Sequence, residues 1–245
     1  MQNPDRDRAS IRRDLSIVIK TRLVELPNFV ELQDDLVHHG FGRVLVSVPR
    51  RHARSFRAQI CPRFTLTTDE EVLDAFGYRE RLADSWYSQQ LLKLLLVQLI
   101  GADKSWVLDA NTLLLRIPDH LFTTNPTSLE CGNLSPEDLQ WHQQSASFLG
   151  VARDKRNAIR PLNQLLRSSV VAQMLDHVAQ RYQNDPIRTL AGALRRGVRN
   201  NFPEWTEYGL YGAFAAHLGV ASRHLFQRNQ TKIAYYRETI EGLDM

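Results

Sequence analysis

The sequence predicts an α/β domain with a mostly parallel central sheet and a mainly helical C-terminal half. Two features lead to this fold class. In the first half, short runs rich in β-branched residues alternate with helical patterns, as is typical of β-α-β units. In the second half, longer helical patterns follow one another. The 245 residues are enough to bury the core of a single domain over 15–245, and the polar residues 1–14 are expected to form a flexible arm.

Five short apolar runs are the predicted strands. Apolar and β-branched residues dominate each run, and prolines, glycines or polar residues bound it. The runs are Leu15–Thr21, Arg43–Pro49, Phe64–Thr67, Ser105–Asp109 and Leu113–Arg116.

Helices are expected between and after these strands. One pattern opens at Pro27 and ends at Gly40, since proline suits the first turn of a helix and glycine its end. Thr68 is a candidate N-cap for a helix that begins with three acidic residues. The best defined helical pattern is Trp86–Ile100, which is apolar and free of Gly and Pro. The second half is expected to hold a loop at 119–136, helices at 136–148, Pro161–Tyr182 and Glu204–Leu218, and a late strand at Val220–Phe226.

The chain is mildly basic, with a formal net charge of +4 and a pI of about 9.2. Five basic residues cluster within one short stretch: Arg50, Arg51, His52, Arg54 and Arg57. This cluster is either a solvated face or a surface that attracts polyanions, anionic lipids or a diphosphate. Nucleic acid is not an expected partner, because the sequence has no zinc-finger spacing, RNP-like aromatic motif or recognisable basic helix.

Cysteine content and hydropathy bear on the location of the protein. The two cysteines, Cys61 and Cys131, lack metal spacing and form no disulfide framework, so a reducing compartment is expected. The first 14 residues contain no apolar run of the signal-peptide type. The longest apolar stretch, Leu91–Ile100, is too short to span a bilayer. We expect a cytoplasmic protein, and peripheral attachment to the inner face of the membrane stays open.

Asp109 and Asn111 are the first candidate site residues. Asp109 ends an apolar strand, and ligands of open parallel sheets bind beyond the carboxyl ends of the strands. Mg²⁺ and Mn²⁺ take oxygen ligands and often bridge to phosphate oxygens, so the two side chains could hold a metal and a diphosphate, or contact a ribose. Alternatively, Asp109 only caps the turn that follows the strand.

Lys93 lies in the most apolar predicted helix, four residues after Gln89 and on the same face. A lysine is costly to bury unless it meets an anion. Here the anion would be a phosphate or the carboxylate of Asp109. In the alternative interpretation, Lys93 extends to water from a partly exposed helix.

A late helix forms the second candidate centre. Glu204, Glu207, Tyr208 and Tyr211 recur with helical spacing, so one face can carry two carboxylates and two phenols. A carboxylate is a suitable base for an acceptor hydroxyl. Otherwise these residues are helix-start acids and core aromatics. Trp141 and its neighbour His142 are a weaker candidate for lining the same side.

Several enzyme classes are disfavoured by motifs that the sequence lacks. It contains no P-loop, no G-x-G-x-x-G after the first strand, no H-E-x-x-H and no G-x-S-x-G. Kinases, dehydrogenases, zinc proteases and serine hydrolases of these types are therefore not expected.

The order of these pieces resembles glycosyltransferases of the GT-A fold, which is Rossmann-related. It is most similar to an uncharacterised group of bacterial glycosyltransferase-like proteins, some of them linked to polysaccharide synthesis. The matching pieces are Val18–Thr21, Thr68–Glu71, Ser85–Lys93, Leu108–Thr112 and Glu207–Tyr211.

The resemblance implies roles for residues on the donor side. Asp109 and Asn111 would take the two positions of the strand-end D-x-D motif, which binds Mn²⁺ or Mg²⁺ together with the ribose and diphosphate of the donor. An asparagine at the second position is a departure that weakens the attraction for a metal. His224 resembles the C-terminal histidine that completes the metal shell. Lys20 and Thr21 would meet the nucleotide, and Asp69 its base or ribose.

The implied activity is transfer of a sugar from a nucleotide-sugar to a hydroxyl of a glycan or glycolipid. Asp109 and Glu207 would be the catalytic residues, with Glu207 as acceptor base if the reaction inverts the anomeric configuration, and Gln89, Gln90 and Lys93 would bind the donor. Inversion and retention both stay open. Residues 15–118 would form the nucleotide-binding half and 119–245 the acceptor-side half. Two alternatives stay open: a non-catalytic nucleotide- or glycan-binding protein of the same fold, favoured by the neutral Asn111, and a nucleotidyltransferase.

Overall fold

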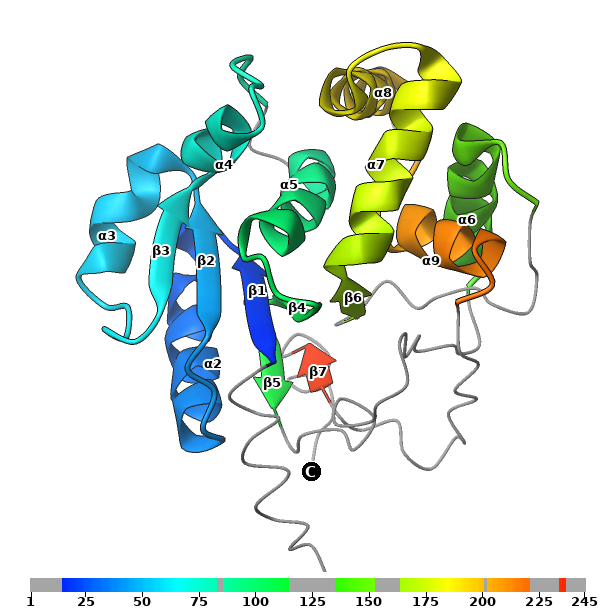
Figure 1. The fold of residues 1–245 in the computed structure, drawn as a ribbon. Coiled ribbons are helices and arrows are strands. Elements are labelled where there is room, and N and C mark those ends of the chain that lie inside the picture. The colour runs from blue at the N-terminus through cyan, green and yellow to red at the C-terminus, as the bar shows by residue number, and fades with distance from the viewer. Residues whose placement is uncertain are drawn as a thin grey trace, which may run out of the picture.

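A five-stranded sheet in the order β3-β2-β1-β4-β6 forms the centre of the molecule (Figure 1). The computed structural model describes residues 15–82, 86–114, 135–152, 164–200, 202–220 and 234–236. The strands of this sheet are β1 (Ser16–Lys20), β2 (Val44–Val48), β3 (Thr65–Thr68), β4 (Lys104–Asp109) and β6 (Leu165–Arg167). The first four pair in parallel, and β6 pairs antiparallel with β4. The prediction of an α/β fold with a mostly parallel sheet is confirmed.

Helices cover both faces of this sheet. The helices are η1 (Leu23–Glu25), α2 (Leu26–His38), η2 (Arg50–His52), α3 (Ala53–Arg57), α4 (Asp69–Ala75), α5 (Trp86–Leu99), α6 (Pro136–Leu149), α7 (Ser168–Tyr182), α8 (Pro186–Asn200) and α9 (Glu207–His217). Apolar residues of α2 and α3 pack on one face, and α5, α7, α8 and α9 share the core on the other. Figure 1 shows α6 to α9 gathered beside α5, away from α2 and α3.

The alternation of side chains along the strands decides which residues face α5. Val18 of β1 and Val107 of β4 belong to the core on the α5 side, and their immediate neighbours pack toward α2. Because successive strand side chains point to opposite faces, Lys20 and Asp109 project on the same face as these valines. The two polar side chains therefore end their strands beneath α5.

Helix α5 is apolar around most of its circumference because it is enclosed on nearly every side. Ten consecutive residues of this helix, Ser88–Val97, are buried between the sheet and the helices of the second half. A helix with apolar residues all around is expected to be a core helix rather than a surface one. Lys93 lies in the middle of this buried stretch.

The predicted strand at Leu113–Arg116 does not join the central sheet. The structure has β5 at Thr112–Leu114, which pairs antiparallel with β7 (Ala234–Tyr236) in a separate two-stranded sheet. Only two residues separate β4 from β5, whereas a parallel crossover needs a connection of a dozen or more residues. The fifth strand of the central sheet is β6 instead.

The second half differs from the prediction at three places. The predicted helix at Pro161–Tyr182 is wrong over Leu165–Arg167, which forms β6, because these residues find an open strand edge at β4. Helix α8 was not predicted as a separate element. Helix α9 begins at Glu207 and not at 204, because the Thr206 side chain accepts a hydrogen bond from the backbone N–H of Gly209 and so caps the helix.

Three expectations lie outside the described residues: the arm at 1–14, nearly all of the loop at 119–136 and the strand at 220–226 apart from its first residue. Val220 itself is not in a strand. In the described ranges, every helix is too short or too polar to cross a membrane.

Helices α6 and α9 meet closely at Gly209. A Cβ atom at this position would lie 2.7 Å from Thr206 Oγ1 and closer still to Ser145 Oγ of α6. The Ser145 hydroxyl also accepts a hydrogen bond from the backbone N–H of Thr206 at 3.1 Å. The absence of a side chain at Gly209 therefore allows α6 to hold the start of α9 in place.

We expect Gly209→Ala to destabilise the protein by about 1–3 kcal/mol, because the added methyl group overpacks the contact between α6 and α9. Gly192→Ala in α8 is the matched control. The Cβ added there would meet only Arg196 Nη1 at 3.8 Å, so the higher helix propensity of alanine should stabilise the protein by up to about 1 kcal/mol. Urea unfolding of both variants measures the two effects. Equal stabilisation of both would contradict the close contact.

Candidate functional site

The strand order places a crevice between the ends of β1 and β4. The chain runs from β1 outward to β2 and β3 and returns with β4 to the other side of β1. Ligands of open α/β sheets bind at such a switch point, beyond the carboxyl ends of the strands. Lys20 and Asp109 are register partners here and stand on the same face. The sheet thus presents a lysine and an aspartate side by side at this edge.

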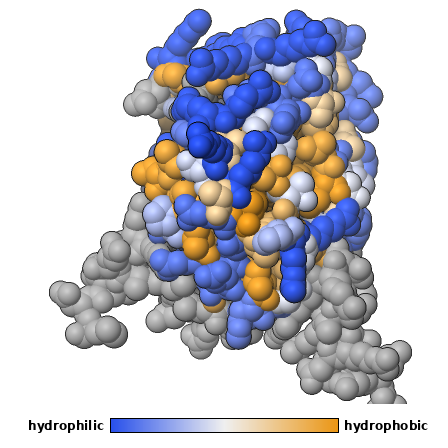
Figure 2. Space-filling model, turned by 90° about the vertical axis from the view of Figure 1, so that its left-hand side faces the viewer, coloured by the Kyte–Doolittle hydropathy of each residue, from blue (hydrophilic) through white to orange (hydrophobic). Residues whose placement is uncertain are grey.

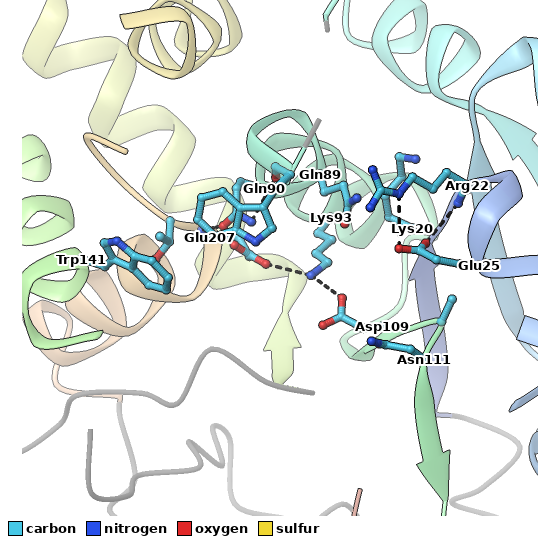
Figure 3. Close-up of a pocket in the computed structure, with 13 residues that line it drawn as sticks. Lys20, Arg22, Glu25, Gln89, Gln90, Lys93, Asp109, Asn111, Trp141 and Glu207 are labelled. Carbon is cyan, nitrogen blue, oxygen red and sulfur yellow. Dashed lines mark hydrogen bonds and ion pairs between the residues drawn. The ribbon is translucent and has the colours of Figure 1, made fainter. Parts of the chain in front are cut away.

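A cavity of about 320 Å³ opens at this place. Its size falls at the lower end of the range for small-molecule sites. Three cationic and three anionic side chains line it, together with two tryptophans and several amides (Figure 3). The lining residues are Lys20, Arg22, Glu25, Trp86, Gln89, Gln90, Lys93, Asp109, Ala110, Asn111, Trp141, Thr206 and Glu207.

Lys93 joins the two predicted catalytic carboxylates at the centre of this cavity. Its Nζ lies 2.7 Å from Asp109 Oδ1 and 3.0 Å from Glu207 Oε1 (Figure 3). The lysine and Glu207 are almost fully buried, and 19% of the Asp109 side chain is exposed. The consecutive elements α5 and β4 and the distant helix α9 each contribute one charge. The sequence suggested a phosphate or the Asp109 carboxylate as the anion that meets Lys93, and the structure shows the contact with Asp109.

Burial and pairing oppose one another in this cluster. Burial disfavours the charged form of Lys93, but the attraction of Asp109 and Glu207 outweighs it and holds the pKa of the ammonium well above its usual range. Burial raises the pKa of Glu207, and the nearby Lys93 only partly offsets this rise. Burial likewise raises the pKa of Tyr208, whose ring lies 5.3 Å from Lys93 Nζ. The cluster combines a persistent cation with a carboxylate that binds a proton more readily than an exposed one.

Gln90 holds Glu207 in position. Its Oε1 accepts a hydrogen bond from the backbone N–H of Glu207 at 3.2 Å, and its Nε2 donates to the carbonyl of Trp86 at 3.3 Å. The first N–H groups of a helix have no partner within the helix, so this bond satisfies a donor at the start of α9. Gln89 and Gln90 both line the cavity, and their role in donor binding stays a prediction.

Lys20 has its own acidic partner. Its Nζ lies 3.2 Å from Asp69 Oδ2, and Ser47 donates a hydrogen bond to Asp69 Oδ1 at 2.6 Å. Burial raises the pKa of Asp69, whereas Lys20 and Ser47 act in the opposite direction. Asp69 does not line the first cavity but a second one of about 580 Å³, which lies at the ends of β2 and β3. The Lys20–Asp69 pair thus joins a lining residue of the first cavity to a lining residue of the second.

Thr21 is placed differently from the prediction. It is buried, does not line the cavity, and donates a hydrogen bond from Oγ1 to Glu25 Oε2 at 3.0 Å. Glu25 also accepts from the backbone N–H of Arg22 at 3.2 Å, and its Oε1 lies 3.4 Å from Arg22 Nε. Thr21 therefore supports Glu25 and Arg22, which do line the cavity.

Arg22, Glu25 and Trp86 are cavity residues that sequence reasoning did not single out. Arg22 follows the end of β1 by two residues, just as Asn111 follows β4, so the strand-end rule could have included it. Glu25 lies in a 3₁₀ turn with an arginine at its N-cap, a residue type that capping rules do not favour. Trp86 begins α5, and no local pattern distinguishes it from a core aromatic.

The residues expected to hold a divalent cation fit that role poorly within the described part of the chain. Asp109 and Asn111 line the cavity, but the Lys93 ammonium contacts Asp109 and repels a metal ion. Asn111 adds only a neutral oxygen. No group of three or more His, Cys, Asp or Glu is arranged to hold a metal among the described residues, and His224 lies outside them.

The basic cluster at 50–57 forms η2 and α3 beside the second cavity. Arg50, Arg51, Arg54 and Arg57 are exposed, and the first two line that cavity. Figure 2 views the molecule from the side on which α3 and β3 lie in Figure 1, and hydrophilic side chains cover much of its upper part. Because its arginines are exposed, the cluster is mostly a solvated face. It reaches the second cavity only through Arg50 and Arg51.

Comparison with protein-family models gives one match, over residues 29–239, to DUF6492, a family of unknown function. The chain belongs to DUF6492. A search of curated proteins finds no match. The part of this DUF6492 chain that the family model covers includes Lys93, Asp109 and Glu207, whereas Lys20 and Arg22 precede it.

We expect Lys93→Met to destabilise this DUF6492 protein by about 3–5 kcal/mol, because it leaves Glu207 buried without its cation. The double variant Lys93→Met/Glu207→Gln should recover part of this loss. Arg79→Met is the control, since Arg79 and its partner Asp74 are both mostly exposed and such pairs contribute little. Chemical denaturation measures all three. A loss in Lys93→Met no larger than in Arg79→Met would contradict the buried cluster.

Proposed function

We propose that the protein is a nucleotide-sugar-dependent glycosyltransferase with the GT-A type of fold, as its resemblance implies. The observation that carries the proposal is the cavity at the switch point, where Lys20 and Asp109 end neighbouring strands and Lys93 connects Asp109 to Glu207. Nucleotides bind at such a point in related α/β sheets, which supports the nucleotide part of the proposal. A cytoplasmic location is part of this proposal and accords with the two-cysteine composition.

The donor would occupy both cavities. The nucleoside would enter the larger cavity beside Asp69, and the diphosphate would pass the Lys20–Asp69 pair into the smaller one. Arg22 is the cation best able to turn toward a phosphate, because 41% of its side chain is exposed and its contact with Glu25 is long, at 3.4 Å. Guanidinium groups bind phosphate oxygens with two parallel hydrogen bonds.

Glu207 would act as the base for the acceptor. The acceptor oxygen forms a bond to the anomeric carbon of the donor while the bond from that carbon to the phosphate oxygen breaks, and the nucleoside diphosphate leaves with the electron pair. Glu207 takes the proton of the attacking hydroxyl. Its raised pKa suits this task, because a base is more effective when its pKa approaches the working pH.

Lys93 and Asp109 would position the reacting groups. Lys93 keeps both carboxylates oriented, and the partly exposed Asp109 can contact a sugar or ribose hydroxyl. The leaving diphosphate gains negative charge, which Lys20 and Arg22 would stabilise from fixed positions. In this scheme, cationic side chains supply the charge that a divalent ion supplies in D-x-D enzymes.

A panel of UDP- and GDP-sugars tests the proposal. At least one should raise the melting temperature, since a ligand of the native state stabilises it by mass action. With a saccharide acceptor present, turnover should fall at least about 100-fold in Glu207→Gln with little change in donor binding, because only the base is removed. Asp109→Ala should impair both turnover and donor binding. Gly192→Ala, outside both cavities, is the control with full activity. The absence of any nucleotide-dependent stabilisation, or full turnover in Glu207→Gln, would refute the proposal.

The charge balance of the smaller cavity favours a second candidate, a non-catalytic saccharide-binding protein. The three cations and three carboxylates of its lining compensate one another, which suits a neutral ligand better than a diphosphate. In that case, saccharides would stabilise the protein, nucleotide-sugars would not, and no donor would be consumed. The same panel separates the two functions.

The pH profile of turnover should report Glu207. Since burial raises its pKa above the ordinary 4.5, the acid limb should lie above that value, with activity lost as the pH falls and the carboxylate gains its proton. Lys93→Met removes the cation that lowers the pKa of Glu207, so the acid limb should shift to a still higher pH. Initial rates across pH, at temperatures where the variant stays folded, measure this shift. An acid limb at the same pH in both proteins would exclude Glu207 as the base.

A further inference from the structure

Two indole rings stand together in the wall of the smaller cavity. Trp86 begins α5 and Trp141 lies in α6, and their ring centroids are 5.4 Å apart with the planes tilted by 39°. Both rings line the cavity. Although Trp86 is one of the largest apolar side chains in the protein, 41% of its surface is exposed. Burial in the core therefore does not explain its position.

Trp141 presents an unused hydrogen-bond donor. Its indole Nε1 is shielded from solvent and has no hydrogen-bond partner in the part of the chain that the structure describes. Buried indole N–H groups usually find a partner, and leaving one unpaired costs free energy. A ligand oxygen that displaced the atoms shielding this donor would remove that cost.

The indole pair lies at the same end of the cavity as the proposed base. Figure 3 shows Trp141 and Glu207 on one side of Lys93, and Arg22 with Glu25 on the other. The cationic end suits the phosphates of a donor, whereas the indole end offers apolar ring faces and a hydrogen-bond donor. A sugar ring matches the second set, because its C–H groups form an apolar face and its hydroxyl oxygens accept hydrogen bonds.

We propose that Trp86 and Trp141 bind a sugar ring of the acceptor, so that the acceptor is a saccharide and not a simple alcohol. This inference rests on the proposed function and adds to it the side chains that bind the acceptor. The ring packs against the exposed Trp86 and accepts a hydrogen bond from Trp141 Nε1. One of its hydroxyls then points toward Glu207, on the side of Lys93 away from Arg22.

Calorimetric titration with maltotriose, cellotriose and chitotriose, in the absence of nucleotide, tests this subsite. At least one of them should bind the wild-type protein, and Trp86→Ala should weaken its binding roughly tenfold through loss of the ring face. Trp141→Phe keeps a ring of similar shape but removes the N–H, so it should weaken binding by a smaller factor. Leu99→Ala is the matched control, because Leu99 is on the same helix as Trp86, is also 41% exposed and does not line the cavity.

The outcomes test the saccharide subsite separately from the proposed glycosyltransferase function. If no trisaccharide binds at millimolar concentration, or if Trp86→Ala binds as tightly as Leu99→Ala, the subsite is overturned even when nucleotides still stabilise the protein. If nucleotide binding falls in the tryptophan variants and saccharide binding does not, the rings take the base of the donor and the inference is wrong. Saccharide binding without nucleotide binding supports the subsite and refutes the transferase.

Discussion

The arrangement of this protein depends on a buried ammonium group held between two carboxylates. Lys93 lies in the middle of the core helix α5, where an unpaired charge would be too costly to bury. Asp109 from the edge of the sheet and Glu207 from the start of α9 compensate it. Because each group needs the others, the cluster ties the sheet, the core helix and the helical half together at one point.

The same cluster shapes the site. It leaves one side of the smaller cavity to Lys20, Arg22 and Glu25, and the other to the indole rings of α5 and α6 (Figure 3). The cations are already paired, so a ligand binds only by exchanging partners with them. Such a cavity gains selectivity from the geometry of its groups rather than from excess charge.

Much of the site was predictable because strand ends and helix faces follow local rules. The positions of Asp109 and Lys20 at strand ends, and of Lys93 on an apolar helix, are visible in the sequence. Arg22 was missed although it follows β1 as Asn111 follows β4, and Trp86 was missed because a helix-start aromatic carries no distinctive local pattern. The role of Thr21 as a support for Glu25 depends on a side-chain contact that spacing alone does not reveal.

The sequence by itself determined the first four strands and the helices α2, α4 and α5, because their periodicity, caps and breakers act within a few residues. It also determined that Lys93 would need an anion. Only the tertiary structure decided that this anion is shared between Asp109 and Glu207, and that Leu165–Arg167 forms a strand, since both depend on partners far away in the chain. The free strand edge at β4 and the charge buried in α5 select these distant segments, and local propensity does not encode such choices.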